Sequence, residues 1–546
     1  MKGRDAIAKI LKKQGVEYIG LIPYNSLEEA VALESIRPII FRQERVGVNL
    51  IDGYARVSSG RQTGVFTMQA GPGAENAFAG VAQAYADSTP ILLLPASAAR
   101  DRVGVHPTFT PSNSYSSVTK WSRQINLPER IPELMRQALH QLINGRPGPV
   151  LLEIPSDLLD AEVDEKLVSD FSRITRYISA ADRQEVQNAS KILLSAQCLV
   201  IHAGTGIHYA EAWNELLELA ELLDAPVMTT LGGKSAFPEN HPLSLGSGGN
   251  TTTGMVRHFL KKADVILGVG CSFTKTSFGT EIPKGKALIH CTNDVNDVGK
   301  DYPVDHALIG DAKLVLRQII DELKLHRRSD RSSVVSEIRD VKKRWMKTWL
   351  PLLNSEDIPI NPYRFINELM KTLDRNKSIV IPDAGSSRDH MTPFYESLVP
   401  RGFIGWGKST QLGYSMGLAM GSKLAMPDRL CVAVMGDYAF GMVGMDFETA
   451  VRERIPVLII VLNNSRMGIY PDDRFPTANR MYGTKFLSGD YTKVAEALGG
   501  YNEKVVSPND IGPAINRAIK VVSSGKPALL EIITRECHEV SGKNDL

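Results

Sequence analysis

Short apolar runs separated by helix-like stretches are the feature that most restricts the fold of this chain. In its first third these runs are residues 16–22, 38–41, 64–68, 91–95 and 150–154. Strands that are apolar along their whole length are typical of parallel sheets, because helices cover both faces of such a sheet. The alternation therefore predicts an α/β fold built on a parallel sheet.

The same pattern returns twice along the 546 residues, and this length favours several domains. The second block has apolar runs at 198–202, 226–229, 265–269 and 287–291, and the third has them at 378–382, 430–435, 457–462 and 528–533. The charged stretch at 160–166 is expected to be a linker, and the one at 325–333 a solvated connection or a helix. We predict three domains, at residues 1–165, 185–325 and 355–540.

Composition excludes several classes of function. Lys and Arg number 63 against 61 Asp and Glu, and no basic block occurs, so nucleic acid and membrane surfaces are not expected partners. The five cysteines form no C-x-x-C pair, which excludes a structural zinc site of the usual kind. No apolar run approaches the roughly 20 residues of a membrane span. We expect a cytoplasmic enzyme that acts on a small molecule.

Polar residues follow two apolar strands of the third block. Gly436 and Asp437 end the first strand, and Asn464, 27 positions after Asp437, ends the second. Because the carboxyl ends of neighbouring parallel strands meet at one edge, these side chains are predicted to converge. Alone, Asp437 could be a helix cap and Asn464 a turn residue. Together they favour a Mg²⁺ site that phosphate oxygens complete.

This spacing resembles the thiamine-diphosphate-binding motif. The resemblance implies that Mg²⁺ is bound by the side chains of Asp437 and Asn464 and by the carbonyl of Arg466, and that the metal holds the diphosphate. Tyr438 stands where the motif usually has Gly, Ala or Ser, which would narrow the loop. The other expected cofactor-binding residues around this motif are Gly436, Ala439, Met467 and Gly468.

Other segments extend the resemblance over the whole chain. Residues 41–44 and 52–56 resemble the family segment that carries its cofactor-activating glutamate, and residues 69–76 resemble a further loop of the family. Residues 231–242 are similar to the central domain of acetolactate synthases. The resemblance implies pyrimidine-binding, central Rossmann-like and diphosphate-binding domains.

Glu44 matches the glutamate that the family places against the cofactor pyrimidine N1′, which helps the cofactor form a carbanion at thiazolium C2. A helix cap or an ion pair with Arg42 or Arg45 is the structural alternative. Leu412, followed by Gly413, matches the apolar residue that bends the cofactor, although a leucine is usually core.

The family architecture also implies that Glu44 serves a cofactor held by another subunit. We therefore expect a homodimer at minimum, and a homotetramer is plausible. Asn25 and Tyr470 are candidate catalytic residues that could donate hydrogen bonds to a substrate carboxylate or oxyanion. The alternative for Asn25 is a turn residue, and the alternative for Tyr470 is an aromatic residue that only packs.

A glycine-rich turn at residues 201–206 follows a strand of the central block. Relatives bind FAD or ADP there, or nothing, and the incomplete glycine spacing leaves all three possibilities open.

The function implied is a decarboxylase or carboligase acting on 2-oxo acids, acetolactate-synthase-like, through a C2 carbanion or enamine. The alternative is a 2-hydroxyacyl-CoA lyase or oxalyl-CoA decarboxylase with an acyl-CoA substrate, favoured by residues 439–449 and 468–470. A nucleotide-binding scaffold without activity is disfavoured because Glu44, Asp437 and Asn464 occur together. A nicotinamide-dependent dehydrogenase has only the incomplete glycine turn in its favour.

Overall fold

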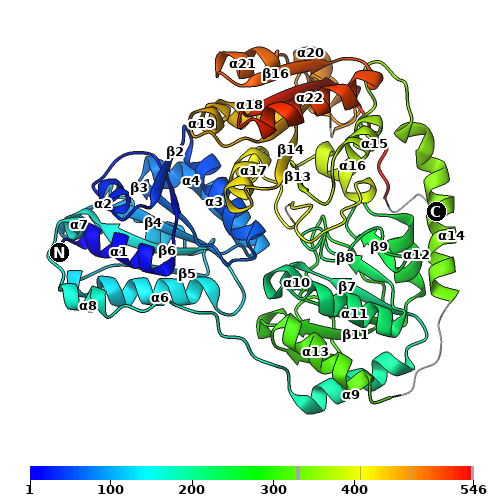
Figure 1. Cartoon of the computed structure of the whole chain (residues 1–546), viewed down its shortest axis with the longest axis horizontal. Coiled ribbons are helices and arrows are strands. Elements are labelled where there is room, and N and C mark those ends of the chain that lie inside the picture. Colours follow the sequence, from blue (N-terminus) through cyan, green and yellow to red (C-terminus); the bar gives the residue numbers. More distant parts are fainter. Residues whose placement is uncertain (327–332, 406, 469, 543–546) are drawn as a thin grey trace.

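The computed structural model describes residues 1–326, 333–405, 407–468 and 470–542. Three sheets, of six, six and five strands, are formed one after another along the chain, and every pairing within them is parallel. The predicted α/β fold with three parallel sheets is therefore confirmed (Figure 1). The exact domain limits stay predictions.

The first sheet has the strand order β2-β1-β3-β4-β6-β5. Its strands are β1 (Tyr18–Leu21), β2 (Arg37–Ile40), β3 (Gly64–Gln69), β4 (Ile91–Ser97), β5 (Trp121–Gln124) and β6 (Val150–Pro155). The helices of this part are α1 (Gly3–Gln14), α2 (Leu27–Leu33), α3 (Glu44–Val57), α4 (Pro72–Asp87), α5 (Pro111–Ser114), α6 (Ile131–Ile143), α7 (Ser156–Leu159) and α8 (Glu165–Ser169).

Alternate residues of β4 belong to different hydrophobic cores. Leu92 and Leu94 pack with residues of α1 and α6 on one face. Leu93 belongs to the core with α3 and α4, and this core continues into the third sheet through residues such as Ile459. Burial on both faces explains why the central strands are apolar along their whole length.

The charged stretch at residues 160–166 is not the free connection that its composition predicted. The backbone of Val163 is hydrogen-bonded to both the amino group and the carbonyl of Met1, and α8 begins at Glu165. The N-terminus therefore holds this stretch against the first sheet. The segment between α8 and the next helix has no helix or strand of its own, and it ends at Asp182, which caps that helix.

The second sheet has the order β12-β11-β10-β7-β8-β9. Its strands are β7 (Leu199–Ala203), β8 (Val227–Thr229), β9 (Ser244–Ser247), β10 (Val265–Val269), β11 (Ala287–Thr292) and β12 (His306–Ile309). Its helices are α9 (Arg183–Ser195), α10 (Thr205–Ala210), α11 (Trp213–Leu223), α12 (Gly254–Lys262) and α13 (Ala312–Leu323). Of the expected connection at 325–333, residues 327–332 lie outside the described residues.

The third sheet has the order β13-β14-β15-β17-β16. Its strands are β13 (Ser378–Pro382), β14 (Leu430–Gly436), β15 (Leu458–Asn463), β16 (Tyr501–Val505) and β17 (Ala528–Ile533). The helices are α14 (Ser333–Leu353), α15 (Pro362–Thr372), α16 (Ser386–Phe394), α17 (Tyr414–Ala425), α18 (Asp437–Val443), α19 (Phe447–Arg452), α20 (Pro476–Tyr482), α21 (Tyr491–Ala497) and α22 (Ile511–Ser523).

Four strands had no counterpart among the predicted runs: β5, β9, β12 and β16. Each of them lies at the edge of its sheet. None of the helices in the described ranges is long and apolar enough to cross a membrane.

Glycines allow α3 and α17 to pack in close contact, which joins the first sheet to the third. A Cβ atom added at Gly421 would lie 1.8 Å from the carbonyl oxygen of Leu50, and one at Gly53 would lie 2.4 Å from that of Leu418. No larger residue fits at these two positions without moving a helix. The two sheets are thereby held in a fixed relation.

Candidate active site

A pocket lies at the carboxyl ends of β14 and β15, as the strand pattern predicted. The strands are neighbours and run parallel, with Gly436 opposite Leu462. The pocket has about 690 Å³ of empty space, its mouth included. Of the predicted cofactor residues, the pocket is lined by Leu412, Gly436, Asp437, Tyr438, Ala439, Asn464, Arg466, Met467 and Gly468.

Asp437 is fixed by backbone groups of its own loop and of the neighbouring strand end. One carboxylate oxygen accepts a hydrogen bond from the N–H of Tyr438, at 2.8 Å, and the other accepts one from Ser465, also at 2.8 Å. Burial raises the pKa of this carboxyl group, and the backbone donors act in the opposite direction. A cation beside Asp437 would offset this cost of burying its charge.

The loop after β15 provides two further oxygen atoms that could bind a metal. The Asn464 side-chain oxygen accepts a hydrogen bond from the N–H of Arg466 at 3.0 Å, and the Arg466 carbonyl accepts one from Gly468 at 2.9 Å. In the described parts of the chain, no three His, Cys, Asp or Glu side chains could hold a metal ion together. A metal here would have one carboxylate, one amide oxygen and one carbonyl as protein ligands.

These residues fit Mg²⁺ and a diphosphate. Mg²⁺ prefers oxygen ligands and commonly completes its shell with phosphate oxygens. Cβ atoms added at Gly385 and Gly436 would meet nothing within 4 Å, so the backbone is open to the cavity at both positions. A ligand's phosphate groups can therefore approach the main chain closely.

Leu412 reaches the pocket from a bend that a buried carboxylate holds. Gly413, which follows it, has φ +84°, a conformation that favours glycine. The N–H of Gly413 donates to Asp383 at 2.8 Å, and Ser415 donates to the same carboxylate through its N–H and its hydroxyl group. Asp383 thus fixes the position from which Leu412 enters the pocket.

Two walls of the pocket were not predicted from the sequence. One is the turn and first helical turns after β13, and the other is the segment after β17. The residues they contribute are Ala384, Gly385, Ser386, Ser387, His390, Thr534, Arg535 and Cys537. The first wall had a usable signal, because an apolar strand at 378–382 is followed by a glycine and two serines.

Glu44 is buried at the start of α3 with 7% of its surface exposed, but it does not line this pocket. Its carboxylate accepts a hydrogen bond from the Asn76 side chain at 3.2 Å. Arg42, a possible partner, pairs with Glu448 at 3.0 Å instead. Within the described ranges no ion pair involves Glu44, so the ion-pair alternative has no support.

Asn25 and Tyr470 also lie outside the residues that line the pocket. The Asn25 side-chain oxygen accepts from the N–H of Leu27 at 2.8 Å, while its buried Nδ2 meets no acceptor among the described residues. Tyr470 is 42% exposed, and its ring packs against Phe475 with ring centroids 5.8 Å apart. Neither residue is brought to the pocket within one chain.

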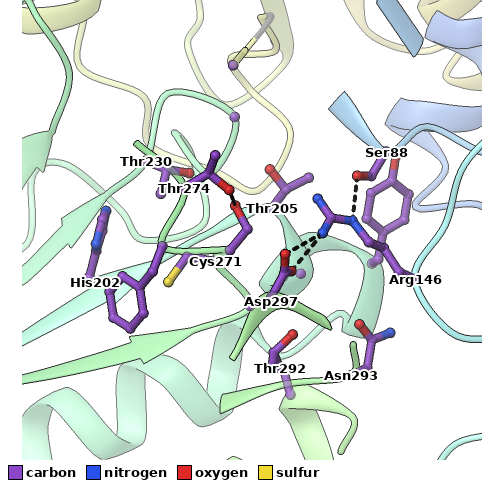
Figure 2. Close-up of a pocket in the computed structure, with 18 of the residues that line it drawn as sticks. Ser88, Arg146, His202, Thr205, Thr230, Cys271, Thr274, Thr292, Asn293 and Asp297 are labelled. Atoms are coloured by element: carbon purple, nitrogen blue, oxygen red, sulfur yellow. Dashed lines mark hydrogen bonds and ion pairs between the residues drawn. The ribbon is translucent and has the colours of Figure 1, made fainter. Parts of the chain in front are cut away.

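A larger cavity, of about 1200 Å³ including its mouth, lies where the three parts of the chain meet. Figure 2 shows Arg146 reaching into it, with two hydrogen bonds to Asp297, at 2.8 and 2.7 Å, and one to Ser88, at 2.9 Å. Lys408 donates to the Ser272 hydroxyl at 2.8 Å. Burial lowers the pKa of Lys408 to about 8.

The predicted glycine-rich turn forms one wall of this central cavity. A Cβ atom at Gly204 would lie 2.3 Å from the carbonyl oxygen of Gly270, and one at Gly206 would lie 2.6 Å from the Gly270 Cα. Close packing of backbone on backbone therefore requires these two glycines. Gly206 itself lines the cavity.

One short segment reaches both cavities. Gly407 and Lys408 line the central cavity, and Leu412 lines the pocket at β14 and β15. The N–H groups of Gly407 and Lys408 donate to Asp87, at 2.9 and 3.1 Å, and Asp383 holds the far end through Gly413. Two buried carboxylates thus fix the segment at its ends.

Comparisons with known proteins agree with this arrangement. The chain matches the N-terminal TPP-binding domain of thiamine pyrophosphate enzymes over residues 1–117, the central domain over 186–319 and the C-terminal TPP-binding domain over 383–532.

Several curated proteins are similar over nearly their whole length. A probable acetolactate synthase large subunit of Methanocaldococcus jannaschii is 31% identical, over 98% of this chain and 92% of the relative. The large subunit of acetolactate synthase isozyme 3 from Escherichia coli is 26% identical, over 97% and 94%. A glyoxylate carboligase of Escherichia coli is 26% identical, over 100% and 95%. The chain therefore belongs to the thiamine pyrophosphate enzymes, in the superfamily that includes acetolactate synthases and glyoxylate carboligase.

Proposed function

We propose that this protein is a thiamine-diphosphate-dependent carboligase that decarboxylates one 2-oxo acid and joins the remaining carbon unit to a second carbonyl compound. The observation that carries the proposal is the pocket at β14 and β15, where Asp437, Asn464 and Arg466 meet Leu412. The similarity to acetolactate synthases and a glyoxylate carboligase supports 2-oxo acids as substrates.

In the proposed site the side chains of Asp437 and Asn464 and the Arg466 carbonyl hold Mg²⁺. The open backbone at Gly436 and Gly385 accommodates the diphosphate. When bound, thiamine diphosphate supplies a nucleophilic carbon and accepts the electron pair that decarboxylation releases. Leu412 would pack against the bound cofactor.

Glu44 completes this site from a second copy of the chain. It is buried and free of ion pairs among the described residues, yet it does not line the pocket of its own chain. Large apolar side chains are exposed in the segments that follow β14 and β15, which supports a partner covering them. They are Tyr438, Met442, Met445, Tyr470, Phe475, Met481, Tyr482 and Phe486. A homodimer is then the smallest active unit, and a homotetramer is consistent with it.

Asn25 is the proposed donor to the substrate carboxylate or oxyanion, because its side chain carries an amide N–H and it lies in the same part of the chain as Glu44. Tyr470, which is 42% exposed, is the second candidate. Asn25, like Glu44, would act from across the interface between copies.

The central cavity is the proposed site of an adenine nucleotide, FAD or ADP. Arg146, Arg176 and Lys408 line it and would face the phosphates. Its volume of about 1200 Å³ accommodates a dinucleotide.

Product analysis by mass spectrometry tests the proposed function. The purified protein is incubated with thiamine diphosphate, Mg²⁺ and, in parallel, pyruvate, glyoxylate or 2-oxobutyrate. Release of CO₂ with formation of acetolactate or a related hydroxy-oxo acid is the expected result. If the cofactor binds but every 2-oxo acid is returned unchanged, the proposal is wrong, and cleavage of a 2-hydroxyacyl-CoA becomes the next reaction to measure.

A further inference from the structure

Glu531 is a carboxylate buried in the middle of the third sheet. It lies in β17, whose other residues are all apolar, and none of its surface is exposed. The strand runs between β15 and β16, away from either edge of the sheet. A charge in such a place costs free energy unless hydrogen bonds or an opposite charge offset the cost. Local rules are broken mainly where function requires it, so the groups that Glu531 contacts indicate what it does.

Amide, backbone and ammonium groups meet the two oxygen atoms of Glu531. Its Oε1 accepts a hydrogen bond from the Nδ2 of Asn463 at 2.7 Å. Its Oε2 accepts one from the N–H of Thr492 at 3.3 Å and lies 3.5 Å from the ammonium group of Lys504, on the neighbouring strand. The charge is thus compensated from the side of β16, while Oε1 is directed at Asn463.

Asn463 connects Glu531 to the loop after β15. It is the last residue of that strand and is 5% exposed. Its Oδ1 accepts hydrogen bonds from the N–H of Ser465 at 2.9 Å and from the Ser465 hydroxyl at 3.2 Å. The same N–H donates to Asp437 at 2.8 Å. Ser465 has φ +55°, a left-handed conformation that few residues other than glycine adopt, so these bonds hold a turn that is otherwise disfavoured.

This turn sets the direction of both candidate metal ligands in the loop. Asn463 points to Glu531 in the sheet, while Asn464, the next residue, lines the pocket. The Asn464 side chain accepts a hydrogen bond from the N–H of Arg466, whose carbonyl is the other candidate ligand. If Ser465 left its conformation, both oxygen atoms would move relative to Asp437.

The carboxylate of Glu531 fixes which way round the Asn463 amide lies. A carboxylate only accepts hydrogen bonds, so the amide must turn its NH₂ group to Glu531 and its oxygen to Ser465. In the reverse orientation, two acceptors would face each other at Glu531 and two donors at Ser465. The orientation of one buried amide therefore decides whether the loop is held.

We propose that Glu531 is a positioning residue for the Mg²⁺ and diphosphate site, acting through Asn463 on the loop after β15. This rests on the proposed function, since it takes Mg²⁺ as the ligand of the loop oxygen atoms. Glu531 does not itself line the pocket, and its effect on the ligand passes through this chain of hydrogen bonds.

Exchanging the two polar groups tests this, because it reverses the hydrogen bond between them without changing the net charge. Asn463→Asp alone puts a carboxylate against Glu531, so Mg²⁺-dependent binding of thiamine diphosphate should weaken by about 10- to 100-fold, the range for residues that orient metal ligands. Glu531→Gln alone sets an NH₂ group against a donor, either Asn463 or Thr492, and should weaken binding by a smaller factor. In the double variant the new amide donates to the new carboxylate, and the affinity should return to near the wild-type value.

Titration calorimetry of the full-length protein, with and without Mg²⁺, measures these affinities. Hydrogen exchange followed by mass spectrometry, on the protein without ligands, is the second readout. Peptides that cover residues 464–468 should exchange faster in Asn463→Asp and at the wild-type rate in the double variant. The matched control is Glu239→Gln, which breaks a buried ion pair with Lys234 and should lose stability without changing either readout.

Losses that multiply in the double variant would overturn the proposal, because the two positions would then act independently. So would an affinity loss in Glu239→Gln as large as that in Asn463→Asp, since general destabilisation would then explain both. A double variant that does not fold also contradicts the proposal, which predicts that its hydrogen bonds are satisfied. If the wild type binds neither Mg²⁺ nor thiamine diphosphate, the proposed function fails, and the exchange data alone then decide whether Glu531 holds the loop.

Discussion

The backbone N–H of Ser465 donates a hydrogen bond of 2.8 Å to the carboxylate of Asp437. This bond joins the loops after two neighbouring strands, and the second loop also carries Asn464 and the Arg466 carbonyl. A change at Asp437 therefore removes a candidate metal ligand and also the bond that sets the spacing of the two loops.

Asp437→Ala should weaken Mg²⁺-dependent binding of thiamine diphosphate by on the order of 100-fold, the upper range for loss of a residue that supports a metal site. Titration calorimetry with and without Mg²⁺ measures this. Asp428→Ala, at an exposed aspartate before β14, is the matched control and should bind normally. Unchanged affinity in Asp437→Ala would exclude this carboxylate as a ligand.

Glu44→Gln should keep cofactor binding and lose most turnover, whereas exposed Glu29→Gln should keep both. If two copies share each site, mixing Glu44→Gln with Asp437→Ala protein should restore activity. Random exchange of subunits gives one intact site in the mixed dimer, on the order of a quarter of wild-type activity. Activity is measured after the mixture has exchanged subunits. No recovery in confirmed mixed dimers would mean that Glu44 acts in its own chain.

Lys234 and Glu239 form a buried ion pair, with side chains 1% and 6% exposed and contacts of 2.5 and 2.6 Å. Glu239→Gln leaves a buried ammonium group without its counter-ion, so the free energy of unfolding should fall by about 3–5 kcal/mol. Urea denaturation measures this change. The control is Glu133→Gln, which removes an exposed ion pair with Arg130 and should hardly move the urea midpoint. The double variant Lys234→Met, Glu239→Met should recover much of the loss.

Buried histidines make the protein less stable in mild acid. Burial, with His290 nearby, lowers the pKa of His202 to about 4 from 6.5. Between these values the unfolded chain binds more protons, so stability falls as pH drops through this window, by up to about 1.4 kcal/mol per pH unit for one group. Urea midpoints from pH 7 to 4.5 should show a smaller slope in His202→Leu. An identical slope would exclude His202 as the cause, and exposed His140→Gln should match the wild type.

Lys408 should make nucleotide binding in the central cavity depend on pH. Its pKa is lowered to about 8 by burial, so its charge is lost as pH rises through that value. The affinity for ADP or FAD should therefore decrease from pH 7 to 9 in the wild type and change little in Lys408→Gln. Flavin absorbance or nucleotide fluorescence measures this. The same pH dependence in both proteins would exclude Lys408 from phosphate binding.

The central strands could be predicted from the sequence and several edge strands could not, for a physical reason. Strands such as Leu458–Asn463 are buried on both faces and so are continuously apolar. The missed strands Trp121–Gln124 and Tyr501–Val505 lie at sheet edges and are partly polar. Their pairing depends on a neighbouring strand that is distant in sequence, which local composition does not reveal.

The convergence of the loops after β14 and β15 was predictable because they follow apolar strands that end at one sheet edge. His390 was not predictable, since it lies within a helix and enters the pocket only through the packing of that helix. Thr534, Arg535 and Cys537 follow a predicted strand, yet nothing in their residue types signals a binding wall. Glu44 could be found only by resemblance, and it does not line the pocket of its own chain.

The segment from Gly407 to Leu412 has a thermodynamic consequence. One end contacts the central cavity and the other supports the cofactor pocket, and it is fixed by Asp87 and Asp383. If a ligand in the central cavity displaced Lys408 from Ser272 and the movement reached Leu412, the two sites would be coupled. Linkage is reciprocal, so each ligand would then alter the affinity for the other by the same factor. Such a coupling would be measurable from either cavity.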